Sequence, residues 1–218
     1  MPARIIVTRP SQLLLSRERF DAPPVEAYVD ARVSHREIDR LTLERAKRGD
    51  RAASRALVAT YQRAVFSMLY RMLVARRSRA IVDELAQETF LRVFRALPGF
   101  EAEGPARLST WILTIASRLA IDELRRPVLL EPLTDEDVDQ AIDDSLHTNA
   151  EQRSIARKIA RAVTDLAPDF RETFVLSVYH ECSHEEIAHS LRIEIGTVKS
   201  RLSRARAAVK EALGEIEV

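Results

Sequence analysis

The chain has 218 residues, of which 46% are hydrophobic and 31% charged, and its formal net charge at pH 7 is +1. Its 5 glycines and its many Ala, Leu, Arg and Glu residues favour an all-α fold of one or two small helical domains. The single cysteine, Cys182, excludes an internal disulfide, and the apolar runs near the start are too short for a signal sequence or a membrane span. We therefore expect a cytoplasmic protein that does not insert into membranes.

Residues 1–37 are predicted to form a variable N-terminal leader. Prolines at positions 2, 10, 23 and 24 prevent a long helix there. The leader contains six arginines, five acids and an apolar run at residues 13–15. It is therefore neither a strongly basic DNA-binding arm nor purely polar. We expect reversible docking and a modest regulatory role. An inert leader and a mis-assigned start codon are the alternatives.

Residues 38–126 are predicted to form a first domain of four helices. Gly49 and Asp50 break the first pair, and Pro98 and Gly99 end the third helix. The expected helices cover about residues 38–48, 50–77, 80–97 and 108–126.

The third and fourth of these helices are predicted to be amphipathic, each with a polar face opposite an apolar stripe. In the third, the apolar stripe is Val82, Ala86, Phe90, Val93, Phe94 and Leu97, and the polar face is Glu84, Glu88, Arg92 and Arg95 with Gln87 at its edge. In the fourth, we expect Leu108, Trp111, Ile112, Ile115 and Leu119 to pack, and Thr114, Arg118, Asp122, Arg125 and Arg126 to face a partner. A polar face that is merely solvated is the alternative for both helices.

Residues 127–150 are predicted to be a flexible acidic linker. They carry seven acids and no Lys or Arg, and they begin with Pro127. The residues before them are basic, with 23 Lys and Arg against 15 Asp and Glu, a net charge of +8. The near-neutral total therefore hides a basic first domain.

Residues 151–218 are predicted to contain a helix-turn-helix, the motif that reads duplex DNA. Ser183 and Glu186 have the spacing of a capping box at the start of its first helix. In the second helix an apolar stripe is formed by Ile195, Val198, Leu202, Ala205 and Val209. The DNA-facing side is then predicted to carry Ser200 and Ser203 at its centre, with Arg204, Lys199, Thr197 and Arg201 beside them and Arg206 nearer the packed edge.

The basic character of that second helix favours a DNA-binding role over a face that only contacts solvent. Residues 192–210 hold six cations against one acid, Glu194.

His180, Cys182 and His184 are residue types that bind metals, but no second cluster completes a tetrahedral site, so we expect no metal. The sequence also has no phosphate-binding glycine loop and no arrangement of nucleophile and base, so we expect neither a cofactor nor an enzyme.

Both domains resemble those of the extracytoplasmic-function (ECF) family of bacterial RNA polymerase sigma factors, of the RpoE-like type. The sequences DELAQETFLRVF at residues 83–94, STWILTIA at 109–116 and DELRR at 122–126, with Phe100, resemble the family's promoter-melting domain. LAPDFRETFVL at 166–176, EEIA at 185–188 and GTVKSR at 196–201 resemble the domain that binds the minus-thirty-five promoter element. The resemblance covers about residues 38–213.

The resemblance implies an alternative sigma factor that binds RNA polymerase core and directs initiation at promoters with minus-ten and minus-thirty-five elements. It makes Glu84, Gln87, Glu88 and Arg92 polymerase-binding residues. The loop of residues 100–107 would hold a base flipped from the non-template strand, and Arg118, Arg125 and Arg126 would hold the separated strand. Lys199, Ser200, Ser203 and Arg204 match the family positions that face the bases of the minus-thirty-five element. From their place on the same helix, Thr197, Arg201 and Arg206 are also expected to bind DNA.

Further expectations follow from the same resemblance. The acidic linker would thread polymerase channels that RNA uses, with a solvated tether as the alternative. An anti-sigma protein is a further partner, and the location is the bacterial cytoplasm at the nucleoid. The rival function is a stand-alone helix-turn-helix transcriptional regulator, although the sequence shows no dimerising coiled coil.

Three positions depart from the family pattern. Glu181 and Arg192 stand where the family usually has turn glycines, so these turns are either strained or different in shape. Arg118 stands where the family often has Asn. The minus-ten preference of relatives therefore does not transfer to this chain.

Overall fold

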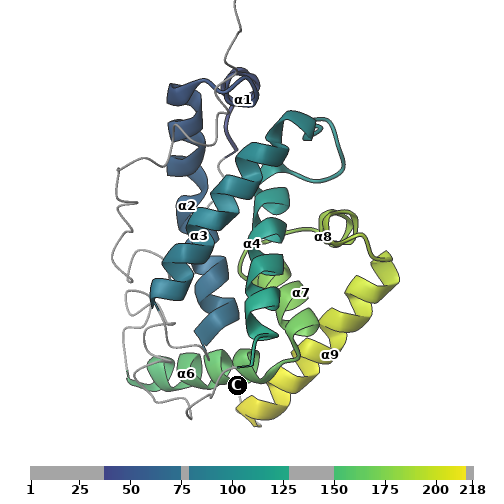
Figure 1. Cartoon of the computed structure of the whole chain (residues 1–218). Helices are drawn as coiled ribbons and strands as arrows, with labels where there is room; N and C mark the ends of the chain where they lie inside the picture. The colour runs from purple at the N-terminus through teal and green to yellow at the C-terminus, as the bar shows by residue number, and fades with distance from the viewer. Residues whose placement is uncertain (1–36, 75–78, 128–149, 215–218) are drawn as a thin grey trace, which may run out of the picture.

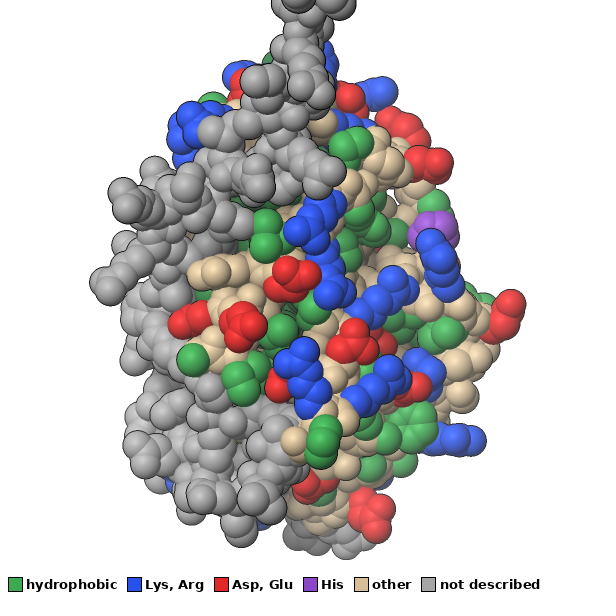
Figure 2. All heavy atoms as spheres, viewed as in Figure 1, with side chains coloured by type: hydrophobic (Ala, Val, Ile, Leu, Met, Phe, Trp, Pro, Cys, Tyr) green, Lys and Arg blue, Asp and Glu red, His purple; other side chains and the backbone are tan. Residues whose placement is uncertain are grey.

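The computed structural model describes residues 37–74, 79–127 and 150–214, and all the regular elements in these residues are helices (Figure 1). The predicted leader up to residue 36 and residues 128–149 of the predicted linker lie outside the described residues. Figure 2 shows one face of the molecule, on which Lys and Arg side chains and Asp and Glu side chains lie among hydrophobic ones. The helices are α1 Arg40–Lys47, α2 Arg51–Leu73, α3 Arg79–Ala96, the 3-10 helix η4 Leu97–Gly99, α4 Leu108–Leu124, α6 Ala150–Asp165, α7 Pro168–Val178, α8 His184–Leu191 and α9 Ile195–Leu213.

The first two helices begin at capping aspartates. The backbone amide of Thr42 donates to Asp39, and that of Ala53 donates to Asp50. Gly49 lies between the two helices with φ 81°, a left-handed conformation that glycine adopts without steric cost. The predicted break at Gly49 and Asp50 is therefore confirmed.

The predicted apolar stripe of α3 is confirmed, with Phe94 half-buried and the other five members buried. The 3-10 turn η4, which has Pro98 near its start, ends this helical run. Helix α4 follows after the loop of residues 100–107. Trp111 on α4 is half-buried.

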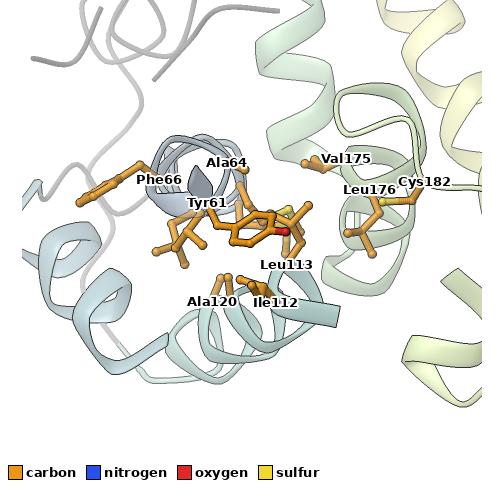
Figure 3. Packing of buried hydrophobic residues seen from close by; sticks show 14 of the residues in the cluster. Tyr61, Ala64, Phe66, Ile112, Leu113, Ala120, Val175, Leu176 and Cys182 are labelled. Atoms are coloured by element: carbon orange, nitrogen blue, oxygen red, sulfur yellow. The ribbon is translucent and has the colours of Figure 1, made fainter. Parts of the chain in front are cut away.

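Helix α2 lies at the centre of the residues before 128 and packs against α1, α3 and α4. Its side chains Val65, Phe66, Met68, Leu69 and Met72 are completely buried. Burying one such side chain stabilises the fold by about 1.5–3 kcal/mol. This helix therefore supplies the main part of the apolar core around it (Figure 3).

The residues after 149 form a second group of four helices. Pro168 starts α7 at a position where its missing amide hydrogen costs no helical bond. Ser183 caps α8 in the predicted capping box, which the structure confirms. Helix α9 packs against α6, α7 and α8.

These two groups, residues 37–127 (the N-terminal half) and residues 150–214 (the C-terminal half), pack directly against each other. Helix α4 contacts α2 and α3 as well as α7 and α8, and helices α6 and α7 also contact α2. Val175, Leu176 and Cys182 belong to the same hydrophobic cluster as Leu113 (Figure 3). The core thus extends across both halves.

This packing overturns one expectation for α4. Thr114, predicted to face a partner, is 2% exposed because the C-terminal half covers this side of α4.

Within the described part of the chain, no helix combines the length and the apolar composition needed to cross a membrane.

Candidate nucleic-acid and polymerase interfaces

Helix α9 presents a polar face opposite a buried apolar stripe. Val198, Leu202, Ala205 and Val209 are buried, as predicted, and Ile195 is half-buried. The exposed side chains opposite them are Lys199, Ser200, Ser203, Arg204 and Arg206. This surface offers three cations and two hydroxyl groups to a partner.

Two other predicted DNA contacts on α9 are less available. Arg201 is half-buried, and its Nη2 donates to Oδ2 of Asp169 on α7 at 2.8 Å. Thr197 is also half-buried, in the first turn of the helix, where its amide donates to the Glu194 carbonyl at 2.8 Å. The structure therefore gives Arg201 an ion-pair partner within the C-terminal half.

Both turns that lack the expected glycine adopt left-handed backbone conformations. Arg192, which ends α8, has φ 58° and ψ 47°, and Glu181 has φ 47°. The next amide, from Ile193, donates to the Ala188 carbonyl at 3.0 Å and completes the turn between α8 and α9. The turn therefore keeps a shape that favours glycine, at a steric cost to the residues present.

The basic side chains of α4 all have partners. Arg118 is exposed, and its Nη2 donates to the Ser190 carbonyl near the end of α8 at 2.8 Å. Arg126 lies 2.8 Å from Glu123 and Arg125 lies 3.6 Å from Asp122, both one helical turn earlier. Arg118 therefore connects α4 to the C-terminal half.

A cavity of about 370 Å³ lies beside the loop of residues 100–107. The N-terminal half lines it with Phe100, Trp111 and Arg118 among others, and the C-terminal half adds His189, Ser190 and Arg192. The rings of Phe100 and Trp111 lie 5.1 Å apart, with an interplanar angle of 42°. The cavity thus combines an aromatic surface with cationic side chains.

The predicted polymerase-binding residues lie together along α3. Glu84, Gln87 and Arg92 are exposed, and Glu88 is half-buried. Arg92 Nε donates to Glu88 Oε1 at 2.8 Å, an ion pair between successive turns that contributes at most about 0.5 kcal/mol to stability. This face can therefore rearrange for a partner at little cost.

Glu186 links the two halves through Arg107. Arg107 Nε donates to Glu186 Oε1 at 2.6 Å and its Nη2 donates to Oε2 at 3.0 Å, while the Ser183 amide donates to Oε2 at 2.9 Å. Burial alone would raise the pKa of Glu186, but the hydrogen bonds from Arg107 and from backbone amides outweigh it and lower this pKa to about 2. The carboxylate therefore stays charged at neutral pH.

Two more polar contacts join α7 to the N-terminal half. Ser117 on α4 donates to Glu172, and Nη1 of the buried Arg171 donates to the Met72 carbonyl of α2 at 2.6 Å. Burial raises the pKa of Glu172, and the Ser117 hydrogen bond partly offsets this effect. Sequence reasoning missed these hydrogen bonds between the halves, because their partners lie 55 to 99 residues apart and no local pattern marks them.

The residues considered as metal ligands do not form a ligand cluster. His180 and Cys182 are buried in the turn before α8, and His184 is the first residue of that helix. In the described residues, no group of three or more His, Cys, Asp or Glu side chains is placed to hold a metal ion.

The sequence matches two protein families in the order predicted. The Sigma-70 region 2 family matches residues 57–127, and the Sigma-70, region 4 family matches residues 156–209. The RNA polymerase sigma-H factor of Pseudomonas aeruginosa is 30% identical over 187 residues, which cover 81% of this chain and 94% of the relative. The ECF RNA polymerase sigma-E factor of Salmonella typhimurium is 30% identical over 185 residues, 78% of this chain and 92% of the relative.

Two solved structures share the fold. CnrH in complex with the cytosolic domain of CnrY matches with a TM-score of 0.57 and 23% identity, over 83% of this chain and 99% of that one. The sigma factor RpoE of Bartonella quintana in complex with the anti-sigma factor NepR matches with a TM-score of 0.54 and 20% identity, over 74% and 97% of the two chains. The chain therefore belongs to the ECF family of RNA polymerase sigma factors, as an RpoE-like alternative sigma factor that directs promoter-specific transcription.

Proposed function

We propose that residues 38–126 bind polymerase core and melt the promoter at the minus-ten element, and that residues 151–218 bind the minus-thirty-five element. Residues 1–37 are then a variable leader, and residues 127–150 an acidic linker between the two domains. The family matches at residues 57–127 and 156–209 support this division.

The observation that carries the proposal is the exposed polar face of α9, opposite its buried stripe. A helix of this kind fits the major groove, where Arg204 reads a base edge and Lys199 and Arg206 bind phosphates. The hydroxyl groups of Ser200 and Ser203 add donors and acceptors for bases. Thr197 and Arg201 contribute at the flanks, once Arg201 leaves Asp169.

The minus-ten element engages the loop of residues 100–107 and the basic side of α4. The aromatic rings of Phe100 and Trp111 stack with an unpaired base. Arg118, Arg125 and Arg126 bind the phosphates of the separated strand. Base–aromatic stacking supplies about 1–3 kcal/mol per base, which offsets much of the cost of unstacking.

Core polymerase binds the α3 face of Glu84, Gln87, Glu88 and Arg92. The exposure of three of these side chains and their distance from the apolar stripe support this role. The protein positions polymerase and opens DNA through binding energy, and catalyses no covalent step itself. It works in the cytoplasm at the nucleoid.

An anti-sigma protein is a further proposed partner. The Bartonella RpoE, which shares this fold, was solved in complex with the anti-sigma factor NepR, and CnrH, which also shares it, was solved with the cytosolic domain of CnrY. An anti-sigma protein silences the chain by covering the surfaces that polymerase needs.

Run-off transcription with purified core polymerase tests the proposal, on DNA from upstream of the protein's own gene. We expect a specific transcript only when the protein is added. If no specific transcript forms and the protein does not co-purify with core, the proposal is wrong. Tight duplex binding without core, as a dimer, would instead support the stand-alone regulator.

Two variants separate the proposed surfaces in the same assay. Gln87→Ala combined with Arg92→Ala should weaken core binding without lowering the melting temperature, since both side chains are exposed. Arg204→Ala is the matched control, with core binding kept and promoter choice lost. Unchanged core binding by the first variant would reject the α3 face.

A further inference from the structure

We propose that Glu37 is a positioning residue for the minus-ten site, because its carboxylate caps the start of α4 and thereby holds Trp111 and the loop of residues 100–107 in place. Glu37 is the last residue of the predicted leader, and it lies 72 residues before the amide that it binds. The inference rests on the proposed role of this loop and of α4 in binding the separated strand.

Helix α4 is not capped by its own N-cap residue. That residue is Arg107, whose side chain makes no capping hydrogen bond. The amides in the first turn of a helix have no acceptor within the helix, and a buried amide that stays unpaired lowers stability. Ser109, in this first turn, is 2% exposed, so water has little access to its amide. The start of α4 therefore needs an acceptor from elsewhere in the chain.

Glu37 supplies that acceptor. The Ser109 amide donates to Glu37 Oε1 at 3.2 Å. A hydrogen bond to a charged oxygen is stronger than one to a neutral acceptor, and a negative charge at this end of a helix also interacts favourably with the helix dipole. Glu37 thus does for α4 what Asp39 and Asp50 do for α1 and α2, but from a distant part of the sequence.

The buried Tyr61 of α2 holds the Glu37 carboxylate in position. The Tyr61 hydroxyl donates to Glu37 Oε2 at 2.8 Å and accepts from the Ile38 amide at 3.2 Å. Burial raises the pKa of this hydroxyl, so it stays protonated and remains a donor. Although Glu37 itself is exposed, each of its two carboxylate oxygens accepts from a buried residue. The carboxylate is therefore held more firmly than that of an ordinary surface side chain.

The capped turn carries part of the proposed single-strand site. Trp111 follows Ser109 by two residues, and its amide donates to the Arg107 carbonyl at 3.0 Å in the same turn. The ring of Phe100, at the start of the loop, lies 5.1 Å from the ring of Trp111. A shift of this turn would move the aromatic pair and the loop together. Loss of the cap should therefore weaken strand binding without removing any of the proposed DNA contacts.

The segment that begins at Glu37 meets the minus-ten region at a second point. Helix α1 packs against η4, directly before the loop, at the same end of the N-terminal half (Figure 1). Arg40 Nη1 of α1 lies 3.1 Å from Glu103 Oε1 in the loop, but the two side chains are 78% and 81% exposed, so this ion pair contributes little. The bond from Ser109 to Glu37 is therefore the stronger constraint on the loop.

Binding of a single-stranded minus-ten oligonucleotide to holoenzyme tests the inference. Each variant is combined with core polymerase and titrated with a fluorescein-labelled non-template strand from upstream of the protein's own gene. We expect Glu37→Ala to bind this strand about fivefold more weakly than wild type or worse, with affinity for core unchanged within about twofold. Glu37→Gln keeps an oxygen that accepts from the Ser109 amide, so it should recover strand binding to within about twofold of wild type.

Glu44→Ala is the matched control, since it removes a carboxylate of α1 that bonds to Lys47 of the same helix. It should bind the strand as tightly as wild type. Equal strand binding by Glu37→Ala and wild type would overturn the positioning role. A parallel loss of affinity for core would also overturn it, because the effect would then be on the whole fold. Failure of the wild-type holoenzyme to bind the strand would instead reject the proposed function.

The fluorescence of Trp111, the only tryptophan in the chain, gives a second readout in the free protein. We expect Glu37→Ala and Tyr61→Phe each to raise the acrylamide quenching constant of Trp111 by about 1.5-fold or more, because either change loosens the first turn of α4. Both changes together should add little to Glu37→Ala alone, since Tyr61 acts through the Glu37 carboxylate. Additive effects, or quenching equal to that of wild type, would contradict the proposed role.

Discussion

The carboxylate of Glu186 accepts both an Nε–H and an Nη2–H bond from Arg107, 79 residues earlier in the chain. The same carboxylate accepts from the Ser183 amide and closes the capping box of α8. One side chain therefore contributes to a local helix start and to the contact between the halves.

A double-mutant cycle should measure this coupling. Arg107→Ala and Glu186→Ala remove opposite members of a part-buried, charge-assisted pair, so each should lower the free energy of unfolding by about 1–3 kcal/mol. Because Glu186→Ala also removes a cap, its effect should be the larger. Urea denaturation should give a coupling energy of at least about 1 kcal/mol, and additive losses would argue against the pair.

Acid should weaken the Glu186 contribution. Burial alone would raise the pKa of Glu186, but the Arg107 and backbone hydrogen bonds lower it from 4.5 to about 2 in the folded state. A lowered carboxylate pKa contributes stability that is complete above about pH 4.5 and is lost as pH falls towards 2. The stability difference between wild type and Glu186→Gln should therefore shrink from pH 7 to pH 3. A constant difference would contradict this assignment.

Cys182 should react slowly with thiol reagents in the folded protein. The side chain is 4% exposed, and burial raises the pKa of its thiol to about 11, so little thiolate forms at pH 8. Labelling by an aromatic disulfide reagent at pH 8 should be far slower than in denaturant. It should accelerate several-fold in Glu186→Gln, and equal rates for the folded and denatured wild type would contradict the burial.

Arg204 and Arg206 should differ in what they contribute to DNA binding. Arg204→Ala should weaken the free energy of binding to the cognate minus-thirty-five duplex by about 1–3 kcal/mol, because a base contact is lost. The loss of binding free energy on scrambled DNA should be much smaller. Arg206→Ala should weaken binding to both duplexes about equally. It should also lower the slope of log K against log salt concentration by roughly one, because one phosphate contact is lost. Fluorescence anisotropy at several salt concentrations measures both. If Arg204→Ala lost the same binding free energy on the two duplexes, the Arg204 side chain would be a phosphate contact and not a base contact.

Arg192→Gly should stabilise the turn between α8 and α9. Arg192 is exposed with φ 58°, a conformation that disfavours residues with a Cβ atom. We expect a gain of about 0.5–1 kcal/mol in the free energy of unfolding. Arg192→Ala is the matched control, since it removes the same side chain and keeps the Cβ. The explanation by strain requires the glycine variant to be the more stable of the two.

Local patterns in the sequence predicted the breaks between the first helices and the apolar faces of α3 and α9. The spacing of Ser183 and Glu186 predicted the capping box, and the period of apolar residues predicted the buried side of α9. Such features depend on residues three to four positions apart, so they are readable without knowing the fold. The roles assigned to the exposed residues remain predictions.

The tertiary structure alone decided which surfaces are free. Periodicity placed Thr114 on the polar side of α4, but it could not indicate that α7 and α8 pack there. Periodicity likewise places Arg201 beside the DNA-facing side of α9, but it does not indicate that Asp169 of α7 pairs with it. A helical pattern states which side of a helix is apolar and not which helix meets it, because that choice depends on the summed packing and hydrogen bonding of residues far apart in the chain.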